Sequence, residues 1–412
     1  MPFFFSSQTQ NSCVFAECDR SLPSYVGHSG LVPLFMQIVA NPKQPRLQEI
    51  VACILCNILY ANDTVEILVE HHRIIETFVQ LLTPTAAQTT CSLLESILIA
   101  LGNIACEPSY KDRLDGIAVS LSMILPKWED AGILTNRRVL RSLSWTFASL
   151  FKNSLPVRIY EASSCLALFA YLLSIKDEEI VTNICSVLFH LIDKEDETSE
   201  WTKEDRIHSI VTTPDLVANL VQHFCSDRKW NEENKFNQIR LVTSMIAASD
   251  VADATLLLEW GIVSTMINLI SHSPSVRIAC EASFGLSQIV MVDTSLLVGI
   301  SLIGSDEIYD LLPIALNLRT HHDLRYELVW LFSTLVCHLD SDQLGSAIKT
   351  NPSLCNLFHL ATSTWKKASD PIVQNSKLAI ENIMALGITA PLLSSFHTAS
   401  DSSQYPGLVG HF

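Results

Sequence analysis

Apolar positions recur along this chain with the period of an α-helix, and polar side chains fill the positions between them. One segment carries apolar residues at spacings of four, four and three, which places them on one helical face: Ile278, Ala282, Leu286 and Ile289. Glu281, Phe284 and Gln288 form a second stripe about 100° round from the first. The pattern predicts a helix with one buried face and a neighbouring semi-polar face that lines a groove.

Segments of this kind return at a nearly constant interval. Each can be anchored on the polar or small residue near its centre: Asn57, Asn103, Ser149, His190, Ser244, Gln288, Thr334 and Asn382. Successive anchors lie 46, 46, 41, 54, 44, 46 and 48 residues apart. Intervals of about 40–47 residues are typical of HEAT and armadillo repeats, in which stacked helical units share one core.

Each unit contains more than the anchored helix. A second apolar helix is predicted at residues 30–44, 167–179 and 261–275, and Gly30 and Gly261 open two of these segments as turn signals. Three helices per unit indicate armadillo rather than two-helix HEAT repeats. We therefore predict an all-α, right-handed superhelical solenoid of about eight to nine armadillo units at residues 24–391. A short extension (1–23) precedes it, and a tail (392–412) follows it.

Composition supports helices and narrows the classes of function. Glycine is scarce, at 13 of 412 residues, which disfavours folds rich in tight turns. The net charge of −16 argues against a nucleic-acid binder and favours basic partners. Mean hydropathy is +0.28, but the longest apolar stretch, Ile50 to Ala61, is far shorter than the ~20 residues of a membrane span. We expect this stretch to be a buried core helix and expect no membrane insertion.

The sequence offers little for catalysis, a cofactor or a metal. No nucleotide-binding glycine motif or nucleophile elbow occurs, so a helical enzyme is the weakest hypothesis. Cys53 and Cys56 form a CxxC, but no second pair completes a zinc site. The 12 cysteines lack the spacing of a disulfide framework, and no secretory signal begins the chain. We expect free thiols in a reducing compartment, no cofactor and no enzyme activity.

A charged segment from Asp193 to Arg206 accounts for the interval of 54 residues. It holds seven acidic and three basic residues, and we expect a solvated loop between repeats. An acidic docking loop is the alternative.

The order of the repeats resembles that of importin alpha, the armadillo adaptor that recognises nuclear localisation signals. The resemblance covers residues 24–388. It is carried by segments similar to the family's third, fourth, fifth, seventh and eighth repeats, at residues 101–114, 141–156, 174–193, 273–290 and 324–336. Arg240 falls where the family's sixth repeat has arginine in place of tryptophan.

In that family the third helices carry a Trp-x-x-x-Asn ladder. The tryptophans hold the stems of Lys and Arg, the asparagines bond the peptide backbone, and nearby carboxylates meet the cationic heads. The resemblance implies these peptide-binding residues: Asn57, Asn103, Glu107, Trp145, Ser149, Glu281, Phe284, Gln288, Glu327 and Trp330.

The ladder is incomplete. Cys53 and Ile99 stand at tryptophan positions, Ser149 and Thr334 stand at asparagine positions, and no repeat from the second to the eighth keeps both members. The acidic positions Glu107, Glu281 and Glu327 are better kept. Loss of about four aromatic slots at ~1 kcal/mol each would lower affinity for a basic peptide about a thousandfold.

Trp145 and Trp330 are open to two interpretations, exposure in the groove or packing between repeats. For the other tryptophans we expect packing or loop positions: Trp128, Trp201, Trp230, Trp260 and Trp365. His190, on the same ladder, is expected to be an ordinary polar groove residue.

The resemblance implies an adaptor of the cytoplasm and nucleus that binds basic, extended peptides of cargo proteins in its concave groove for nuclear import. The family's basic importin-beta-binding segment has no counterpart in residues 1–25, where Arg20 is the one basic residue. We therefore expect weak or no docking to importin-beta. The alternative is a catenin-like armadillo scaffold, outside transport, that binds another extended or helical protein segment.

Overall fold

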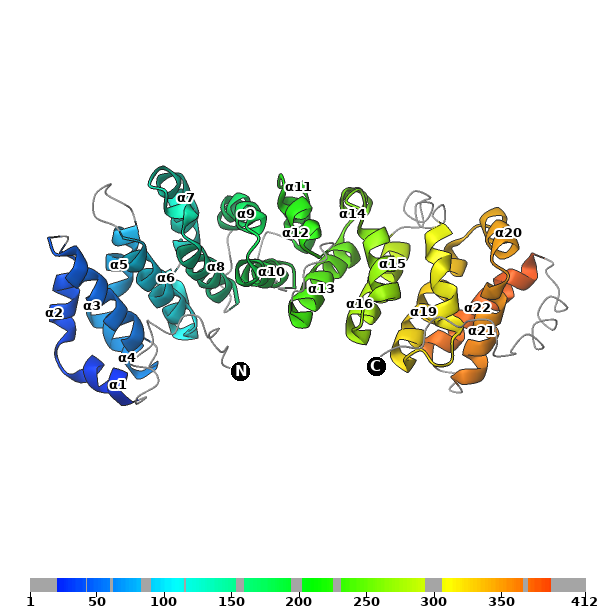
Figure 1. The fold of residues 1–412 in the computed structure, drawn as a ribbon, viewed down its shortest axis with the longest axis horizontal. Helices are drawn as coiled ribbons and strands as arrows, with labels where there is room; N and C mark the ends of the chain where they lie inside the picture. Colours follow the sequence, from blue (N-terminus) through cyan, green and yellow to red (C-terminus); the bar gives the residue numbers. More distant parts are fainter. Residues whose placement is uncertain are drawn as a thin grey trace. The chain divides into compact units, whose positions relative to one another are not determined.

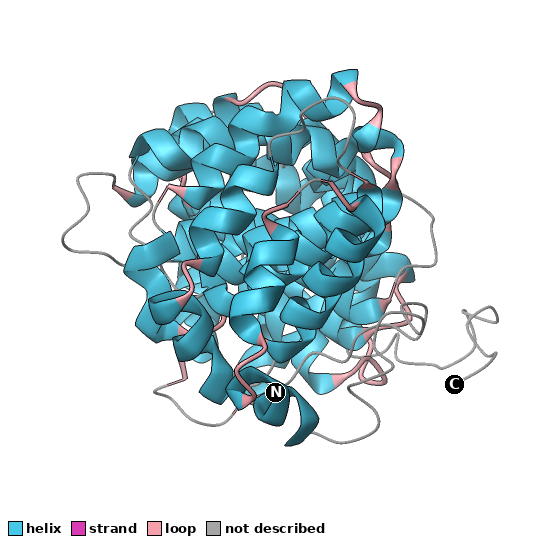
Figure 2. Cartoon of the chain, turned by 90° about the vertical axis from the view of Figure 1, so that its left-hand side faces the viewer, coloured by secondary structure: helices cyan, strands magenta, loops and turns pink. Residues whose placement is uncertain are grey.

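The computed structural model is built from helices throughout its described part, which comprises residues 21–41, 43–59, 62–82, 90–114, 116–152, 159–193, 202–224, 231–292, 306–365 and 370–386 (Figure 1). No strand occurs in these ranges, as the colouring by secondary structure makes clear (Figure 2). The chain divides into two compact units, unit 1 (Met1–His223) and unit 2 (Phe224–Phe412), and each is described by itself.

Unit 1 repeats a pattern of short helix, second helix and long third helix. Its elements are α1 (Ser21–His28), α2 (Val32–Val39), α3 (Pro45–Ile58), α4 (Asn62–Glu66), η1 (Ile67–His71), α5 (Ile74–Leu82), α6 (Cys91–Ala105), η2 (Pro108–Leu114), α7 (Ile117–Asp130), η3 (Ile133–Thr135), α8 (Arg137–Lys152), α9 (Ile159–Ser174), α10 (Glu178–Asp193), α11 (Lys203–Thr212) and α12 (Leu216–Phe224, which ends one residue into unit 2). The third helices are α3, α6, α8 and α10.

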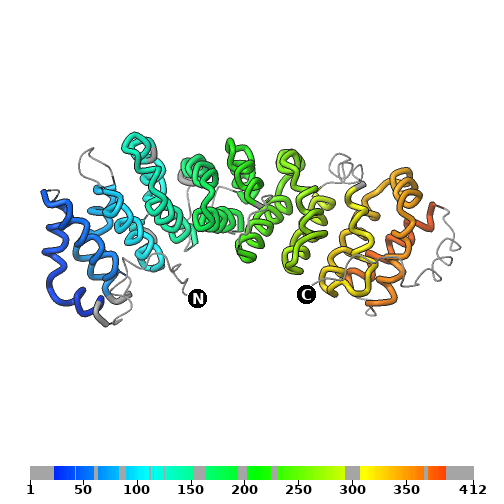
Figure 3. The backbone as a smooth tube through the Cα atoms, in the orientation of Figure 1, coloured from blue at the N-terminus to red at the C-terminus, as the bar shows by residue number. Residues whose placement is uncertain are grey.

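Unit 2 continues the same pattern, which can be followed along the backbone trace (Figure 3). Its elements are α13 (Glu232–Ala248), α14 (Val251–Leu258), α15 (Ile262–His272), α16 (Val276–Met291), η4 (Asp306–Leu311), α18 (Leu312–Leu316), α19 (His322–His338), α20 (Ser341–Thr350), α21 (Ser353–Thr364) and α22 (Pro371–Ala385). The third helices here are α13, α16, α19 and α22. All eight anchor residues lie in third helices, so the predicted all-α armadillo fold is confirmed.

Consecutive third helices pack side by side within each unit, α3 on α6, α6 on α8 and α8 on α10, then α13 on α16, α16 on α19 and α19 on α22. The apolar stripe predicted for α16 is buried: Ile278, Ala282, Leu286 and Ile289. Phe284 on the neighbouring stripe remains exposed, and Glu281 and Gln288 are half-buried. The two-stripe prediction is therefore confirmed.

Local capping explains where several helices begin. Ser275 caps α16 by accepting a hydrogen bond from the Ile278 N–H, and Asp340 forms a capping box with Gln343 at the start of α20. Gly30 and Gly261 adopt φ of 74° and 73° immediately before the second helices, as the turn signals predicted. Few other residues tolerate this left-handed backbone.

Three expectations differ from the structure at their boundaries. Residues 203–206 begin α11 rather than continue a loop, because Thr202 and Asp205 form a capping box and Arg206 is buried. Residues 194–201 lie outside the described residues. Within the stretch expected to be a buried helix, α3 ends at Ile58 and Ile50 is exposed. Ser21 already begins α1, and residues 387–412 are outside the described part.

Membrane crossing was tested by helix length and composition. Across the described ranges, no single helix is both long and apolar enough to span a membrane. The adjoining α14 and α15 meet the criterion only as a pair bent by 62°.

One close approach fixes the spacing of two third helices in unit 1. The ring of Trp145 on α8 lies so close to Gly102 on α6 that a Cβ built on this glycine would be 2.1 Å from ring atom Cζ3. No side chain larger than hydrogen fits at Gly102 unless the indole moves. Trp145 therefore packs between repeats as well as being half-accessible.

We predict that Gly102→Ala destabilises unit 1 by about 1–3 kcal/mol, because the overlap with Trp145 outweighs the better helix propensity of alanine. Gly345→Ala is the matched control: Gly345 lies in α20, and an added Cβ there has no atom within 4 Å. It should stabilise by about 0.4–1 kcal/mol. Urea unfolding followed by circular dichroism measures both changes, and equal effects of the two substitutions would contradict the packing role of Gly102.

Candidate functional site: an acidic pocket on the third helices of unit 2

A pocket of about 500 Å³ opens between three consecutive third helices of unit 2. α13 contributes one side chain, α16 contributes five, and α19 and its N-cap contribute three. The lining residues are Phe236, Val276, Arg277, Cys280, Glu281, Phe284, His321, Asp323 and Glu327. The pocket therefore brings together the sequence-predicted residues Glu281, Phe284 and Glu327.

The helical period explains why these side chains meet. Glu281 lies three positions before Phe284 on α16, and Glu327 lies four positions after Asp323 on α19. Residues three and four apart share a helical face, and α16 packs directly against α19. The buried stripe of each helix fixes its rotation, so the neighbouring stripes turn toward a common accessible surface.

The pocket is acidic and partly desolvated. Burial raises the pKa of Glu281, which the guanidinium groups of Arg240 and Arg277 lower only in part. Burial also raises the pKa of Glu327, and the charges of Glu281 and Asp323 raise it further. Since the negative charges of Glu281 and Asp323 still raise the pKa of Glu327, nearby cations do not neutralise them completely. The site is therefore arranged to favour an added positive charge.

Cys280 lies among these carboxylates. Burial, followed by the charges of Glu327, Asp323 and Glu281, raises the pKa of its thiol to about 11. The thiolate form needed for nucleophilic chemistry is scarce at such a pKa. Cys280 thus contributes a small apolar surface to the pocket rather than a reactive group.

Arg277 closes one side of the pocket. Its guanidinium carbon lies 3.6 Å from the ring centroid of Phe236, within the range of a cation–π contact. The same guanidinium pairs with Glu233, through Nη1 to Oε2 and through Nη2 to Oε1, the latter at 3.3 Å. Because Arg277 is engaged by Glu233 and Phe236, its charge does not fully offset Glu281.

The remaining predicted residues of unit 2 lie near the pocket without lining it. Gln288 is one helical turn beyond Phe284 on α16 and is half-buried, as is Trp330 on α19. Thr334, at the family's asparagine position after Trp330, is buried, and its hydroxyl has no hydrogen-bond partner. A buried threonine offers no amide to a peptide in this repeat.

The predicted residues of unit 1 lie on α3, α6 and α8. Asn103 Nδ2 donates to the carbonyl of Cys56 at 3.3 Å, and Asn57 Nδ2 lies 3.8 Å from Cys53 Sγ. Both asparagines are half-buried, so each keeps some accessible surface. Ser149 is only 5% exposed, because it faces into the repeat packing, which leaves it little surface for a peptide.

Glu107 has neighbours that sequence reasoning missed. The pKa of Tyr110 is raised, first by desolvation and then by the charges of Glu66, Glu70 and Glu107, so these three carboxylates act on the same phenol. Arg113 pairs with Glu70 at 2.7 Å. Glu66 in α4 and Glu70 in η1 lie about 40 residues earlier in the chain, and spacing along one helix cannot reveal them.

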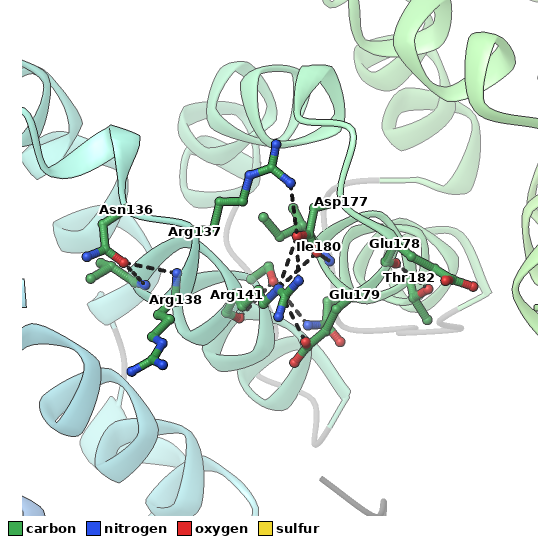
Figure 4. A network of polar contacts seen from close by, with 12 residues as sticks. Asn136, Arg137, Arg138, Arg141, Asp177, Glu178, Glu179, Ile180 and Thr182 are labelled. Atoms are coloured by element: carbon green, nitrogen blue, oxygen red, sulfur yellow. Dashed lines mark hydrogen bonds and ion pairs between the residues drawn. The ribbon is translucent and has the colours of Figure 1, made fainter. Parts of the chain in front are cut away.

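The third helix α8 of unit 1 carries arginines. Arg141 on α8 reaches Asp177, the residue before α10, with Nε 3.1 Å from both carboxylate oxygens and Nη2 2.8 Å from Oδ2 (Figure 4). Glu179 lies 3.5 Å from Arg141 Nε, and Arg137 lies 3.9 Å from Asp177. The hydrogen bond to Asp177 is the main reason that the pKa of Arg141 is raised. These arginines hold α8 against α10 and make this surface less acidic than the unit 2 pocket.

The tryptophans outside the ladder are packing or loop residues where the structure describes them. Trp128 is buried and its Nε1 donates to the Leu82 carbonyl at 3.2 Å, Trp365 is buried, and Trp260 is exposed after α14. Trp201 and Trp230 lie outside the described residues. Among the described residues, no three His, Cys, Asp or Glu side chains are placed to hold a metal ion.

The stacked three-helix units define an all-α protein of the armadillo-repeat class. The fold is similar to that of an engineered protein solved by crystallography, with a TM-score of 0.63 at 17% identity, covering 97% of this chain and 93% of the other. No protein-family model matches the sequence.

Within that class the chain is importin-alpha-like and divergent. It is 27% identical over 210 residues to importin subunit alpha-2 of Arabidopsis thaliana, and 27% identical over 200 residues to importin subunit alpha-8 of the same plant. These matches cover 50% and 48% of this chain and span 36% and 40% of the relatives' own lengths.

We predict that Asp177→Asn destabilises unit 1 by about 1–3 kcal/mol. Asparagine can still cap α10. It has no negative charge, however, so the guanidinium of Arg141 loses its ionic partner at this buried position. The control is Glu233→Gln, which removes a carboxylate from an ion pair whose two side chains are both about half-exposed. It should cost at most about 1 kcal/mol. Unfolding midpoints in urea measure both, and a larger loss for Glu233→Gln would contradict the assignment.

Proposed function

We propose that this protein is an importin-alpha-like adaptor that binds basic, extended segments of cargo proteins for import into the nucleus. The observation that carries the proposal is the acidic pocket of unit 2. Two carboxylates with raised pKa values and an exposed phenyl face share one opening, which is suited to a lysine or arginine side chain. The cytoplasm and nucleus are the compartments that this activity requires.

The pocket matches both parts of a cationic side chain. Phe284 is 41% exposed and offers its ring to the aliphatic stem and the charge, an interaction of about 0.5–2 kcal/mol. Glu281 and Glu327 would accept charge-assisted hydrogen bonds from the head group. The Gln288 amide, one turn further along α16, supplies a donor and an acceptor for the backbone of an extended peptide.

Unit 1 would contribute a second, weaker set of contacts. Asn57 and Asn103 offer amides, Glu107 lies in an acidic cluster, and Trp145 presents the part of its ring that does not pack on Gly102. With aromatic slots missing and Ser149 buried, binding here should be weaker than an unbroken ladder would give.

A catenin-like scaffold is the second candidate function. Burial of Ser149 and Thr334 favours it, because neither can hold a peptide backbone as an asparagine does. Capture assays with importin-beta do not separate the two candidates, because a scaffold outside transport expects no capture, and binding of a basic peptide is the test that does. The adaptor proposal expects weak capture or none through residues 1–25, which hold a single basic residue, Arg20.

A labelled Lys-rich peptide should bind the protein in the micromolar range by fluorescence anisotropy, and Glu327→Gln should weaken binding about five- to tenfold. The substitution removes one charge while it keeps the side-chain shape. Glu259→Gln is the control, since this exposed carboxylate lies just after α14 and away from the pocket residues. Absence of binding at hundreds of micromolar would favour the scaffold instead.

Peptide binding should weaken as pH falls, starting above the range in which a glutamate of ordinary pKa 4.5 titrates. The raised pKa values mean that Glu281 and Glu327 take up protons at higher pH and then lose their attraction for a cation. His321 also lines the pocket, so the same measurement on His321→Gln separates the part of the profile that belongs to the two glutamates. Dissociation constants measured between pH 8 and pH 4.5 test this prediction, and Glu327→Gln should make them depend less on pH. If Glu327→Gln leaves the pH dependence of binding unchanged, the prediction is wrong.

A further inference from the structure

A buried arginine in unit 2 has no anionic partner. Arg325 lies near the start of α19 and is 8% exposed. Its Nε is enclosed and makes no hydrogen bond, and no carboxylate of the described residues forms an ion pair with its guanidinium. A buried charge without a counter-ion is costly, so buried charges in proteins are usually paired. The surroundings of Arg325 therefore favour an added anion.

The same position is apolar in most other third helices. Nine residues before the anchor, the buried apolar residues are Leu94, Leu140, Val181, Ala279 and Val373. Gln48 takes this position on α3, where its Nε2 donates to the Val39 carbonyl at 2.6 Å. Lys235 takes it on α13 and is only half-buried. Within the described third helices, Arg325 is thus the one polar residue at this position that is both buried and without a hydrogen bond.

A second buried donor lies beside Arg325. Trp365 directly follows α21 and is 9% exposed, and the guanidinium carbon of Arg325 lies 5.7 Å from the centroid of its ring. The indole Nε1–H has no acceptor among the described residues, whereas buried Trp128 donates from Nε1 to the Leu82 carbonyl. Guanidinium and indole groups donate hydrogen bonds and do not accept them. Neither can satisfy the other, so both require an acceptor.

Aromatic rings and engaged carboxylates lie next to these two donors. The ring centroids of His322 and Tyr326 are 5.7 Å and 5.8 Å from that of Trp365. Asp370 Oδ1 accepts from the Tyr326 hydroxyl and from a backbone N–H of α22, both at 3.1 Å. Asp323 Oδ1 lies 3.4 Å from His322 Nδ1. These carboxylates have other partners, and their charges disfavour an anion with more than one negative charge.

We propose that Arg325 and Trp365 form a binding site for a carboxylate group. A carboxylate has two oxygens, so one accepts from the guanidinium while the other accepts from the indole N–H, and its single charge neutralises Arg325. A water molecule would accept hydrogen bonds but would leave the charge unpaired. Phosphate carries more negative charge and is repelled more strongly by Asp323 and Asp370. The carboxylate is either a free ion or an acidic side chain of a bound protein segment.

The indole N–H of Trp365 reports occupancy of the site directly by nuclear magnetic resonance. In protein that contains isotope-labelled tryptophan, Trp365→Phe identifies this resonance. Sodium acetate, exchanged for sodium chloride at constant ionic strength, should shift it in a saturable manner. Arg325→Leu and Arg325→Gln should each weaken acetate binding at least about tenfold, because the charge-assisted hydrogen bonds are lost. The matched control is Arg319→Leu, which removes an exposed arginine before α19 and should leave the affinity unchanged.

Three results would overturn the proposal. They are a Trp365 resonance that does not respond to acetate, a response that both Arg325 substitutions leave unchanged, and tighter binding of inorganic phosphate than of acetate. Circular dichroism checks that each variant is folded. In the absence of acetate, Arg325→Leu should unfold at the same urea concentration as the unsubstituted protein or at a higher one, because two other third helices bury leucine at this position.

A capped peptide with one aspartate and no basic residue distinguishes the two sources of the carboxylate. Tighter binding than acetate assigns the carboxylate to a protein segment, and an affinity no higher than that of acetate assigns it to a free ion. Either result supports the site. Neither Arg325 nor Trp365 lines the acidic pocket of unit 2, so Arg325→Leu should leave binding of the Lys-rich peptide unchanged. The carboxylate site and the proposed function can therefore fail separately.

Discussion

The packing of consecutive third helices on their apolar stripes is the interaction on which the rest of the structure depends. Burying one stripe of α16 against its neighbours fixes the rotation of this helix about its axis. Once that rotation is fixed, the positions of Glu281, Phe284 and Gln288 follow from helical geometry. The accessible stripe therefore requires no interaction of its own to orient it, which leaves its side chains free to vary in chemistry.

This separation between a packing stripe and an accessible stripe explains how much could be predicted from the sequence. The interval of about 46 residues and the three-helix unit depend on the local spacing of apolar residues, which is visible in the sequence itself. Glu281 and Glu327 were implied by the resemblance to importin alpha, and helical spacing agrees, because each lies three positions before an aromatic residue on one helix. The prediction of one loop at residues 193–206 was wrong for residues 203–206, which begin α11. Asp205 was counted only as a charged residue, although with Thr202 it forms the capping box that starts this helix.

Contacts between helices were harder to predict. Phe236, Cys280 and Asp323 line the pocket because α13, α16 and α19 bring them together, and no spacing along a single helix reveals this. The burial of Ser149 and Thr334 was missed for a related reason. The small side chains of Ser149 and Thr334 are buried between repeats, whereas Asn57 and Asn103 are half-buried, so position alone does not guarantee accessibility. The resemblance to importin alpha indicated which positions to inspect, but packing determined which of them remain available.

Under the proposed function, the distribution of charge among the third helices, rather than the net charge of the chain, determines where a cation would bind. The residue three positions before the tryptophan position of the ladder differs between the units. It is Ser142 on α8 and Asn183 on α10 in unit 1, but Glu281 on α16 and Glu327 on α19 in unit 2. On α8, Arg138 lies one turn before Ser142 and Arg141 lies one turn before Trp145, and Arg141 is committed to Asp177. A carboxylate paired in this way stabilises the stack but has no charge left for a ligand. In unit 2, burial and then the charges of Glu281 and Asp323 raise the pKa of Glu327, which indicates charge left uncompensated. Ion pairing within the stack and the proposed binding of a cation thus use the same residue types at different positions of one repeating helix.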